Sequence, residues 1–136
     1  MLVMSRDEVE ARLDLDELID ALAAALAEFS AGRVSVPTRI AAHVGERDAI
    51  LGVMPAYLPS AGALTTKLVS LFPRNEGSAL PTHQAVIVAF DPETGEPEAL
   101  LDGTAITAIR TGACSALSAR LLAREDAWDP CGRSGS

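Results

Sequence analysis

The chain has 136 residues, of which 49% are hydrophobic and 22% are charged. This length and composition are typical of one globular domain with a substantial core. The 19 acidic and 11 basic residues give a formal net charge of -8. The surplus of acid argues against nucleic acid or an anionic membrane as a partner, because both attract Lys and Arg.

The cysteines and the first residues bear on the cellular compartment. Cys114 lies in an expected helix and Cys131 in a polar tail, so neither has a spacing typical of a disulfide or a metal site. The apolar start, residues 1–4, is too short for a signal peptide, and no apolar run approaches the length of a membrane span. We therefore expect a cytoplasmic protein without a metal site.

Two helix starts lie close together near the N-terminus. Ser5 and Glu8 form a capping-box pattern, and Asp14 and Glu17 form a second one. After the second start, apolar residues recur every three to four positions until Gly32. This pattern predicts a short helix followed by an amphipathic one.

The middle of the chain is rich in strand signals. Five segments have strand character: residues 34–44, 49–57, 62–72, 85–90 and 97–101. The turn before the last of them contains Pro92 and Gly95, which suit a hairpin. Asp102 then opens a helix that we expect to run from residue 104 to about residue 123.

The last helix is rich in small residues, which lets another element or a ligand approach its backbone. Its larger apolar side chains predict a packing stripe of Ile106, Ile109, Leu117 and Leu121. Together the elements predict an α+β fold with two N-terminal helices, a mixed or largely antiparallel sheet of about five to six strands, and a long C-terminal helix.

Three cations stand where the pattern favours apolar or neutral residues. Lys67 is the only lysine of the chain and lies inside a strand pattern, Arg39 starts another strand, and Arg110 lies two turns into the last helix. A buried lysine is costly unless it meets an anion. Converging cations would bind a carboxylate, and desolvation beside the two arginines would lower the pKa of Lys67. The alternative is that each is an ordinary surface charge.

Several motifs resemble the ornithine cyclodeaminase/mu-crystallin family. They are Leu-Pro-Thr-His at residues 80–83, the hairpin and Asp-Gly pair at residues 90–103, and Ile-Thr-Ala-Ile-Arg-Thr at residues 106–111. The resemblance covers residues 1–126. It implies that Arg39, Lys67 and Arg110 hold a substrate carboxylate, with Lys67 as the candidate catalytic residue.

The resemblance also implies a cofactor and further site residues. It places Thr82 and Arg110 against a dinucleotide, NAD or NADP, and Met54 near the substrate amino group. Complete relatives convert L-ornithine to L-proline and ammonia through NAD-dependent hydride transfer. Other relatives reduce cyclic ketimines with NAD(P)H or dehydrogenate alanine. The family also predicts a homodimer that pairs through sheet edges, and a non-catalytic dimerisation or ligand-binding domain stays open as an alternative.

The end of the chain departs from the family pattern. Relatives continue into a strand and a glycine-rich loop that open a Rossmann domain, but no strand precedes Gly132 and Gly135 here. We expect residues 127–136 to be a polar tail, disordered or out of frame, in a truncated or frameshifted product. We accordingly expect no stable cofactor binding by this chain alone.

Overall fold

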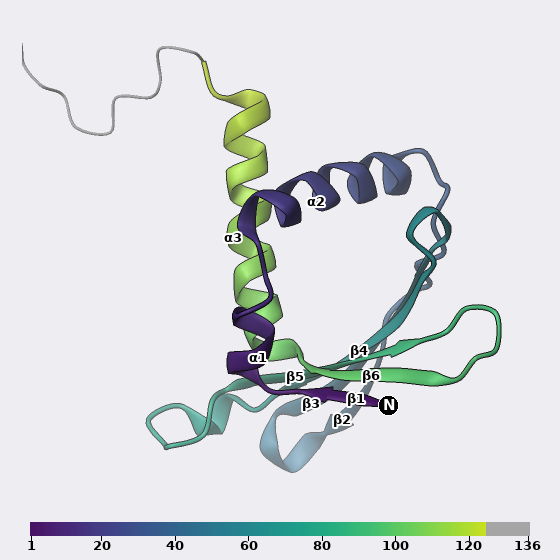
Figure 1. The fold of residues 1–136 in the computed structure, drawn as a ribbon. Helices are drawn as coiled ribbons and strands as arrows, with labels where there is room; N and C mark the ends of the chain where they lie inside the picture. Colours follow the sequence, from purple (N-terminus) through teal and green to yellow (C-terminus); the bar gives the residue numbers. More distant parts are fainter. Residues whose placement is uncertain (125–136) are drawn as a thin grey trace, which may run out of the picture.

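A computed structural model describes residues 1–124 (Figure 1). Within them the chain forms three α-helices: α1 (Arg6–Glu10), α2 (Leu15–Ser30) and α3 (Gly103–Leu122). The strands are β1 (Leu2–Met4), β2 (Ile40–Val44), β3 (Ala49–Leu58), β4 (Ala63–Leu71), β5 (His83–Phe90) and β6 (Pro97–Asp102). They form one sheet in the order β1-β6-β5-β4-β3-β2, in which β1 is parallel to β6 and the other pairs are antiparallel. The α+β prediction is confirmed.

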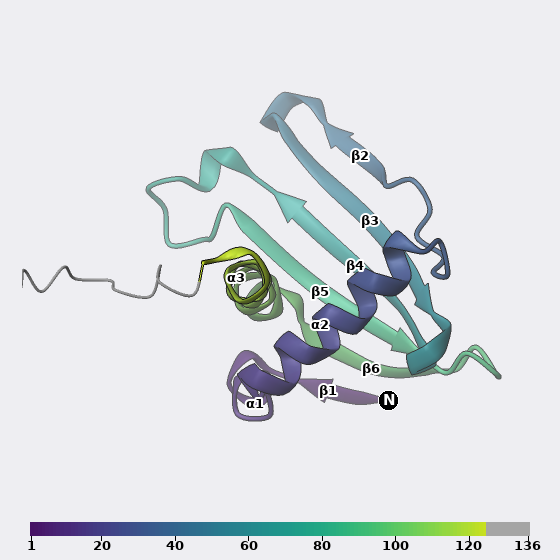
Figure 2. The same ribbon diagram turned by 90° about the horizontal axis from the view of Figure 1, so that it is seen from above.

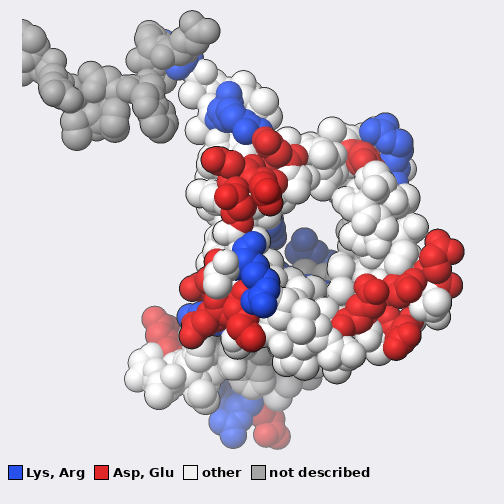
Figure 3. Space-filling view, viewed as in Figure 1, with Lys and Arg blue, Asp and Glu red and all other residues white. Residues whose placement is uncertain are grey.

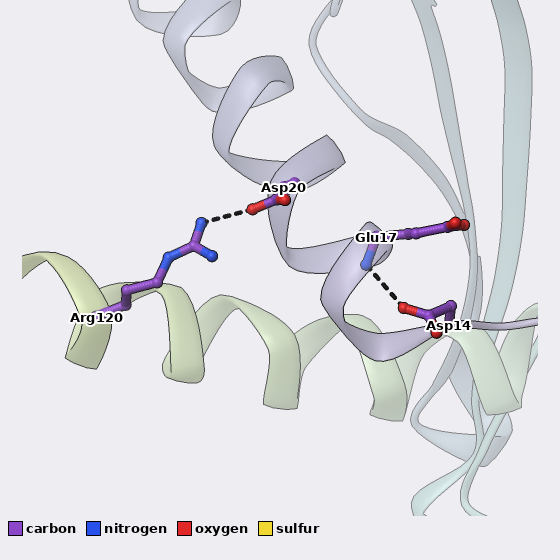
Figure 4. Close-up of polar contacts among 4 residues, drawn as sticks. All are labelled: Asp14, Glu17, Asp20 and Arg120. Carbon is purple, nitrogen blue, oxygen red and sulfur yellow. Dashed lines mark hydrogen bonds and ion pairs between the residues drawn. The ribbon is translucent and has the colours of Figure 1, made fainter.

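The helix starts follow from local hydrogen bonds that the sequence predicts. The side chain of Glu8 accepts a hydrogen bond of 2.9 Å from the backbone N–H of Ser5. Asp14 Oδ1 accepts one of 2.9 Å from the backbone N–H of Glu17 (Figure 4). Asp102 caps α3 through its side chain in the same manner. Each cap satisfies a backbone donor that the first helical turn leaves without a partner.

Helices α2 and α3 both lie on one face of the sheet. α3 rises from the sheet, and α2 crosses above the strands from α3 toward the β3–β4 end (Figures 1 and 2). The two helices meet in a small core around Ile19, Ala113 and Leu117. An exposed ion pair of 2.9 Å between Arg120 and Asp20 also joins them (Figure 4), but such pairs stabilise a fold by only about 0–1 kcal/mol.

The start of α3 sits directly on β5. A Cβ added at Gly103 would lie only 3.0 Å from the carbonyl carbon of Ala85. Thr104 strengthens this contact, because its Oγ1 accepts a hydrogen bond of 2.9 Å from the backbone N–H of Ala85. The beginning of α3 is therefore fixed against the middle of the sheet.

Two features differ from the sequence predictions. β1 was not predicted, because three apolar residues carry too weak a signal without their partner strand β6. The strand predicted at residues 34–44 is shorter, since β2 begins at Ile40 and only Ser35, which bridges to Tyr57, pairs before it.

The predicted tail at residues 127–136 lies outside the described residues. Among residues 1–124, no helix has the length and apolar character needed to cross a membrane.

Candidate functional site

The strand register places two of the predicted site residues in one row across the sheet. Met54 on β3 pairs with Lys67 on β4, and Lys67 pairs with Ile87 on β5. Arg39 lies one residue before β2, outside the strand pairs, in the segment where the register changes by one residue between the Ser35–Tyr57 bridge and the Ile40–Val53 pair. Directly opposed residues of antiparallel strands share one face. Met54, Lys67 and Ile87 therefore form a row along a single face.

That face is the one covered by the helices, and Lys67 contacts α3 directly. Lys67 Nζ donates a hydrogen bond of 3.2 Å to Thr107 Oγ1. Thr107 Oγ1 in turn donates one of 2.6 Å to the backbone carbonyl of Gly103, which leaves its lone pairs facing Lys67. An ammonium group has three donors. Only one of them is used within residues 1–124, so the other two are available to a ligand.

Arg39 and Arg110 lie close enough to Lys67 for their charges to act on it. Arg110 follows Thr107 by three residues, so the two share one face of α3. Partial burial of the Lys67 ammonium lowers its pKa, and the positive charges of Arg110 and Arg39 lower the pKa further. Both arginines are exposed, and the convergence of the three cations in one carboxylate site stays a prediction. We refer to Lys67, Arg39 and Arg110 as the cation cluster.

The cation cluster has no acidic partner among the described residues. Neither guanidinium nor the ammonium forms an ion pair with an Asp or Glu of residues 1–124. This is notable in a chain with 19 acidic side chains. Figure 3 shows acidic side chains on the outer surface and basic atoms at the back of a hollow between the helices and the sheet. Like charges that are held together without a counter-charge favour an anionic ligand.

Thr82 lies beside the cation cluster rather than within it. It lines a cavity of about 540 Å³ together with His83 and the α3 residues Thr104, Thr107 and Thr111. Thr107 is also the hydrogen-bond partner of Lys67, so the cavity adjoins the cation cluster. The cavity is within the range of small-molecule sites, and its hydroxyl groups can donate and accept hydrogen bonds.

The sequence analysis did not single out three residues that line this cavity: Thr104, Thr107 and Thr111. Their spacing of three and four positions does put them on one helix face, which is a usable signal. The signal is not specific, because the hydroxyl of a helical threonine commonly donates a hydrogen bond to the backbone carbonyl four residues earlier. Thr107 and Thr111 also do so here. Within residues 1–124, no group of three or more His, Cys, Asp or Glu side chains is arranged to hold a metal ion.

A family model of the ornithine cyclodeaminase/mu-crystallin family matches residues 1–130. The chain belongs to this family. It is 44% identical over 123 residues to the ketimine reductase mu-crystallin of Mus musculus, a match that covers 88% of this chain and 39% of that protein. The chain therefore spans about two fifths of the length of this curated relative.

Solved structures of family members share the fold described above. The Thermococcus litoralis Delta(1)-pyrroline-2-carboxylate reductase in complex with NADH and L-proline matches with a TM-score of 0.86 and 40% identity, over 93% of this chain and 39% of that one. An archaeal alanine dehydrogenase dimer with bound NAD matches with a TM-score of 0.83 and 33% identity, over 91% and 38%. These relatives bind NAD or NADH, and the one solved with L-proline holds a small amino acid.

Proposed function

We propose that this chain supplies the carboxylate-binding half of an NAD(P)H-dependent reductase of cyclic imino acids. The observation that carries the proposal is the cation cluster, in which the charges of Arg110 and Arg39 act on Lys67 and no acidic partner is found among the described residues. A forked guanidinium and a compact ammonium are suited to the two oxygens of a carboxylate. Reduction is favoured over ornithine cyclisation because the relatives at 44% and 40% identity carry the names of imine reductases.

In this proposal each side chain has a separate task. Arg39, Lys67 and Arg110 bind and orient the substrate carboxylate, and Met54 lies beside the bound carbon skeleton. Lys67 is also the residue proposed to hold or pass a proton, because its lowered pKa makes a neutral amine accessible at a lower pH than in an ordinary lysine. Binding of the carboxylate at these groups holds the reacting carbon so that it faces the cofactor, which is an orientation effect.

The hydroxyl-lined cavity next to the cation cluster fits part of a dinucleotide. Thr82, with Thr107 and Thr111 opposite, offers hydrogen-bonding groups, and Arg110 offers a positive charge for a phosphate. The proposed cofactor contacts are Thr82 and Arg110. When bound, NADH or NADPH supplies the hydride for the imine. The cavity is adjacent to Lys67 through Thr107, so the two ligands would lie side by side.

Nuclear magnetic resonance titration of the chain with pyrrole-2-carboxylate, a flat and stable analogue of a cyclic imino acid, tests this proposal. We expect shifts of backbone amides in the middle of β3 and β4 and in the first three turns of α3. Pyrrole-2-carboxamide, which has the same ring and no charge, is the matched control and should produce none. Equal shifts from both compounds, or none from either, would contradict carboxylate binding at the cation cluster.

We also propose that two copies of the chain pair through the sheet face opposite the helices. Among the described residues no helix covers that face (Figure 1), and it exposes Ile40, Leu51 and Val86 at 67%, 44% and 39%. Exposed apolar patches of this kind typically mark interfaces. The arrangement differs from the edge pairing predicted from the sequence. Sedimentation should show a dimer that Leu51→Asp converts to a monomer, and a wild-type monomer would contradict the proposal.

A further inference from the structure

A second cavity lies on the same face of the sheet as Lys67. It has a volume of about 340 Å³ and lies under the second half of α2. Its walls include Leu22, Ala25 and Phe29 from α2, Val36 from the segment after it, and Ala56 and Thr65 from the sheet. None of the described residues that line it is charged. We refer to it as the apolar cavity.

The strand register fixes the distance between the apolar cavity and the cation cluster. Thr65 precedes Lys67 by two residues on β4, so both side chains point to the same face and their Cα atoms are roughly 7 Å apart. On β3, Ala56 follows Met54 by two residues and pairs with Thr65. The floor of the apolar cavity is therefore the row of side chains next to the row that carries Lys67.

We infer that the apolar cavity takes the side chain of the acid whose carboxylate is held by the cation cluster. The substrate class is then 2-imino acids, cyclic or open-chain, and 2-oxo acids whose carbon chain is uncharged and apolar. This inference rests on the proposed function, since the carboxylate must be anchored at Lys67 for the side chain to reach the row of Ala56 and Thr65. The terminal ammonium of ornithine would find no acidic partner among the described residues of this cavity, and a charge placed there without one is costly.

The occupant follows from what borders the cavity. Ala56 and Thr65 line the cavity and stand in the row next to Met54 and Lys67, so a small acid anchored at Lys67 can place its side chain there. The volume of the apolar cavity is at the lower end of small-molecule sites, which suits one aliphatic or aromatic group.

The test is a series of 2-oxo acids that differ only in chain length: pyruvate, 2-oxobutanoate and 2-oxopentanoate. Each is titrated into the chain, and dissociation constants are taken from amide chemical shifts. Burial of each added methylene should raise the affinity about fourfold, so 2-oxopentanoate should bind about 15-fold more tightly than pyruvate. If all three acids bind with equal affinity, the inference is wrong, but the proposal of a carboxylate site is not contradicted.

Two neighbouring alanines of α2 provide matched variants. Ala25 lines the apolar cavity, whereas Ala24 is exposed and does not line it. Ala25→Leu should reduce the affinity ratio between 2-oxopentanoate and pyruvate to about twofold or less, while Ala24→Leu should keep it near 15-fold. Equal ratios in the two variants would overturn the inference. If Ala25→Leu does not fold, Phe29→Ala, which removes one wall, should lower the ratio instead.

A separate outcome identifies failure of the proposed function. If even pyruvate fails to bind the wild-type chain, the cation cluster holds no carboxylate and both proposals fall. If pyruvate binds and Lys67→Met weakens all three acids by a similar factor, the anchor is confirmed. In that case the chain-length series tests only whether the apolar cavity binds the side chain of the acid.

Discussion

Replacement of Lys67 by methionine probes the carboxylate site with a defined magnitude. The side chain keeps a similar length and apolar stem but loses the charge and the donors, two of which are free within residues 1–124. A hydrogen bond to a charged group contributes about 1.5–3 kcal/mol. Since Lys67 is only half-buried and solvent screens its charge, the lower part of that range, about 1.5–2 kcal/mol, applies. Lys67→Met should therefore weaken pyrrole-2-carboxylate binding about 10- to 30-fold.

The assay is calorimetric or resonance titration between pH 7 and pH 10.5 with wild type, Lys67→Met and Arg47→Met. Arg47 lies in the short 3-10 helix Gly45–Arg47 between β2 and β3, so its replacement removes the same charge away from the cation cluster. It should change the affinity less than twofold. Wild-type binding should weaken as the pH rises through the lowered pKa of Lys67, and Lys67→Met should lack that pH dependence. An affinity within twofold of wild type for Lys67→Met would refute the reasoning.

Three further predictions concern stability, each measured by denaturant unfolding. Leu117→Ala should cost about 2–4 kcal/mol because Leu117 is 3% exposed, whereas Leu121→Ala, at a position 69% exposed, should cost less than about 0.5 kcal/mol. Gly103→Ala should cost about 1–3 kcal/mol because its Cβ would press on the β5 backbone, and a neutral effect would contradict that contact. The folded state lowers the pKa of Lys67, so the unfolded chain binds more protons between that pKa and about 10.4. Stability from this group should rise with pH across that window, and no such rise should appear in Lys67→Met.

The elements that the sequence predicts well are those with local causes. The caps at Ser5, Asp14 and Asp102 involve residues three positions apart, so the helix starts can be read directly. The hairpin between β5 and β6 is equally local, since Asp91 Oδ1 accepts hydrogen bonds from the backbone N–H groups of Glu93 and Thr94. Interactions between residues that are close in the sequence can therefore be predicted from the sequence alone.

Features that depend on distant partners were predicted less well. β1 exists because β6 pairs with it almost a hundred positions later in the chain. The packing stripe of α3 was predicted from its large apolar residues, but Leu121 is 69% exposed and the fully buried residue is Ala113, at 0%. A small side chain allows α2 to approach α3 closely, and that approach depends on tertiary packing rather than on local hydrophobicity.

The candidate site also combines features that the sequence predicts and features that depend on tertiary packing. A lysine inside a strand pattern was sufficient to single out Lys67, and the lowered pKa agrees with the expectation that two arginines lie near it. Its partner Thr107 could not be predicted, because that contact depends on how α3 is placed over β4. The position of the apolar cavity beside the site was equally hidden, since it depends on the path of α2 across the sheet.

The pKa of the Lys67 ammonium tests the central claim most directly, and it can be measured by resonance without ambiguity because Lys67 is the only lysine of the chain. The account predicts a pKa below the ordinary value of about 10.4, a rise in that pKa when Arg39 or Arg110 is replaced by methionine, and a rise on addition of pyrrole-2-carboxylate. An ordinary pKa that responds neither to those replacements nor to the ligand would contradict a cation cluster that binds a carboxylate.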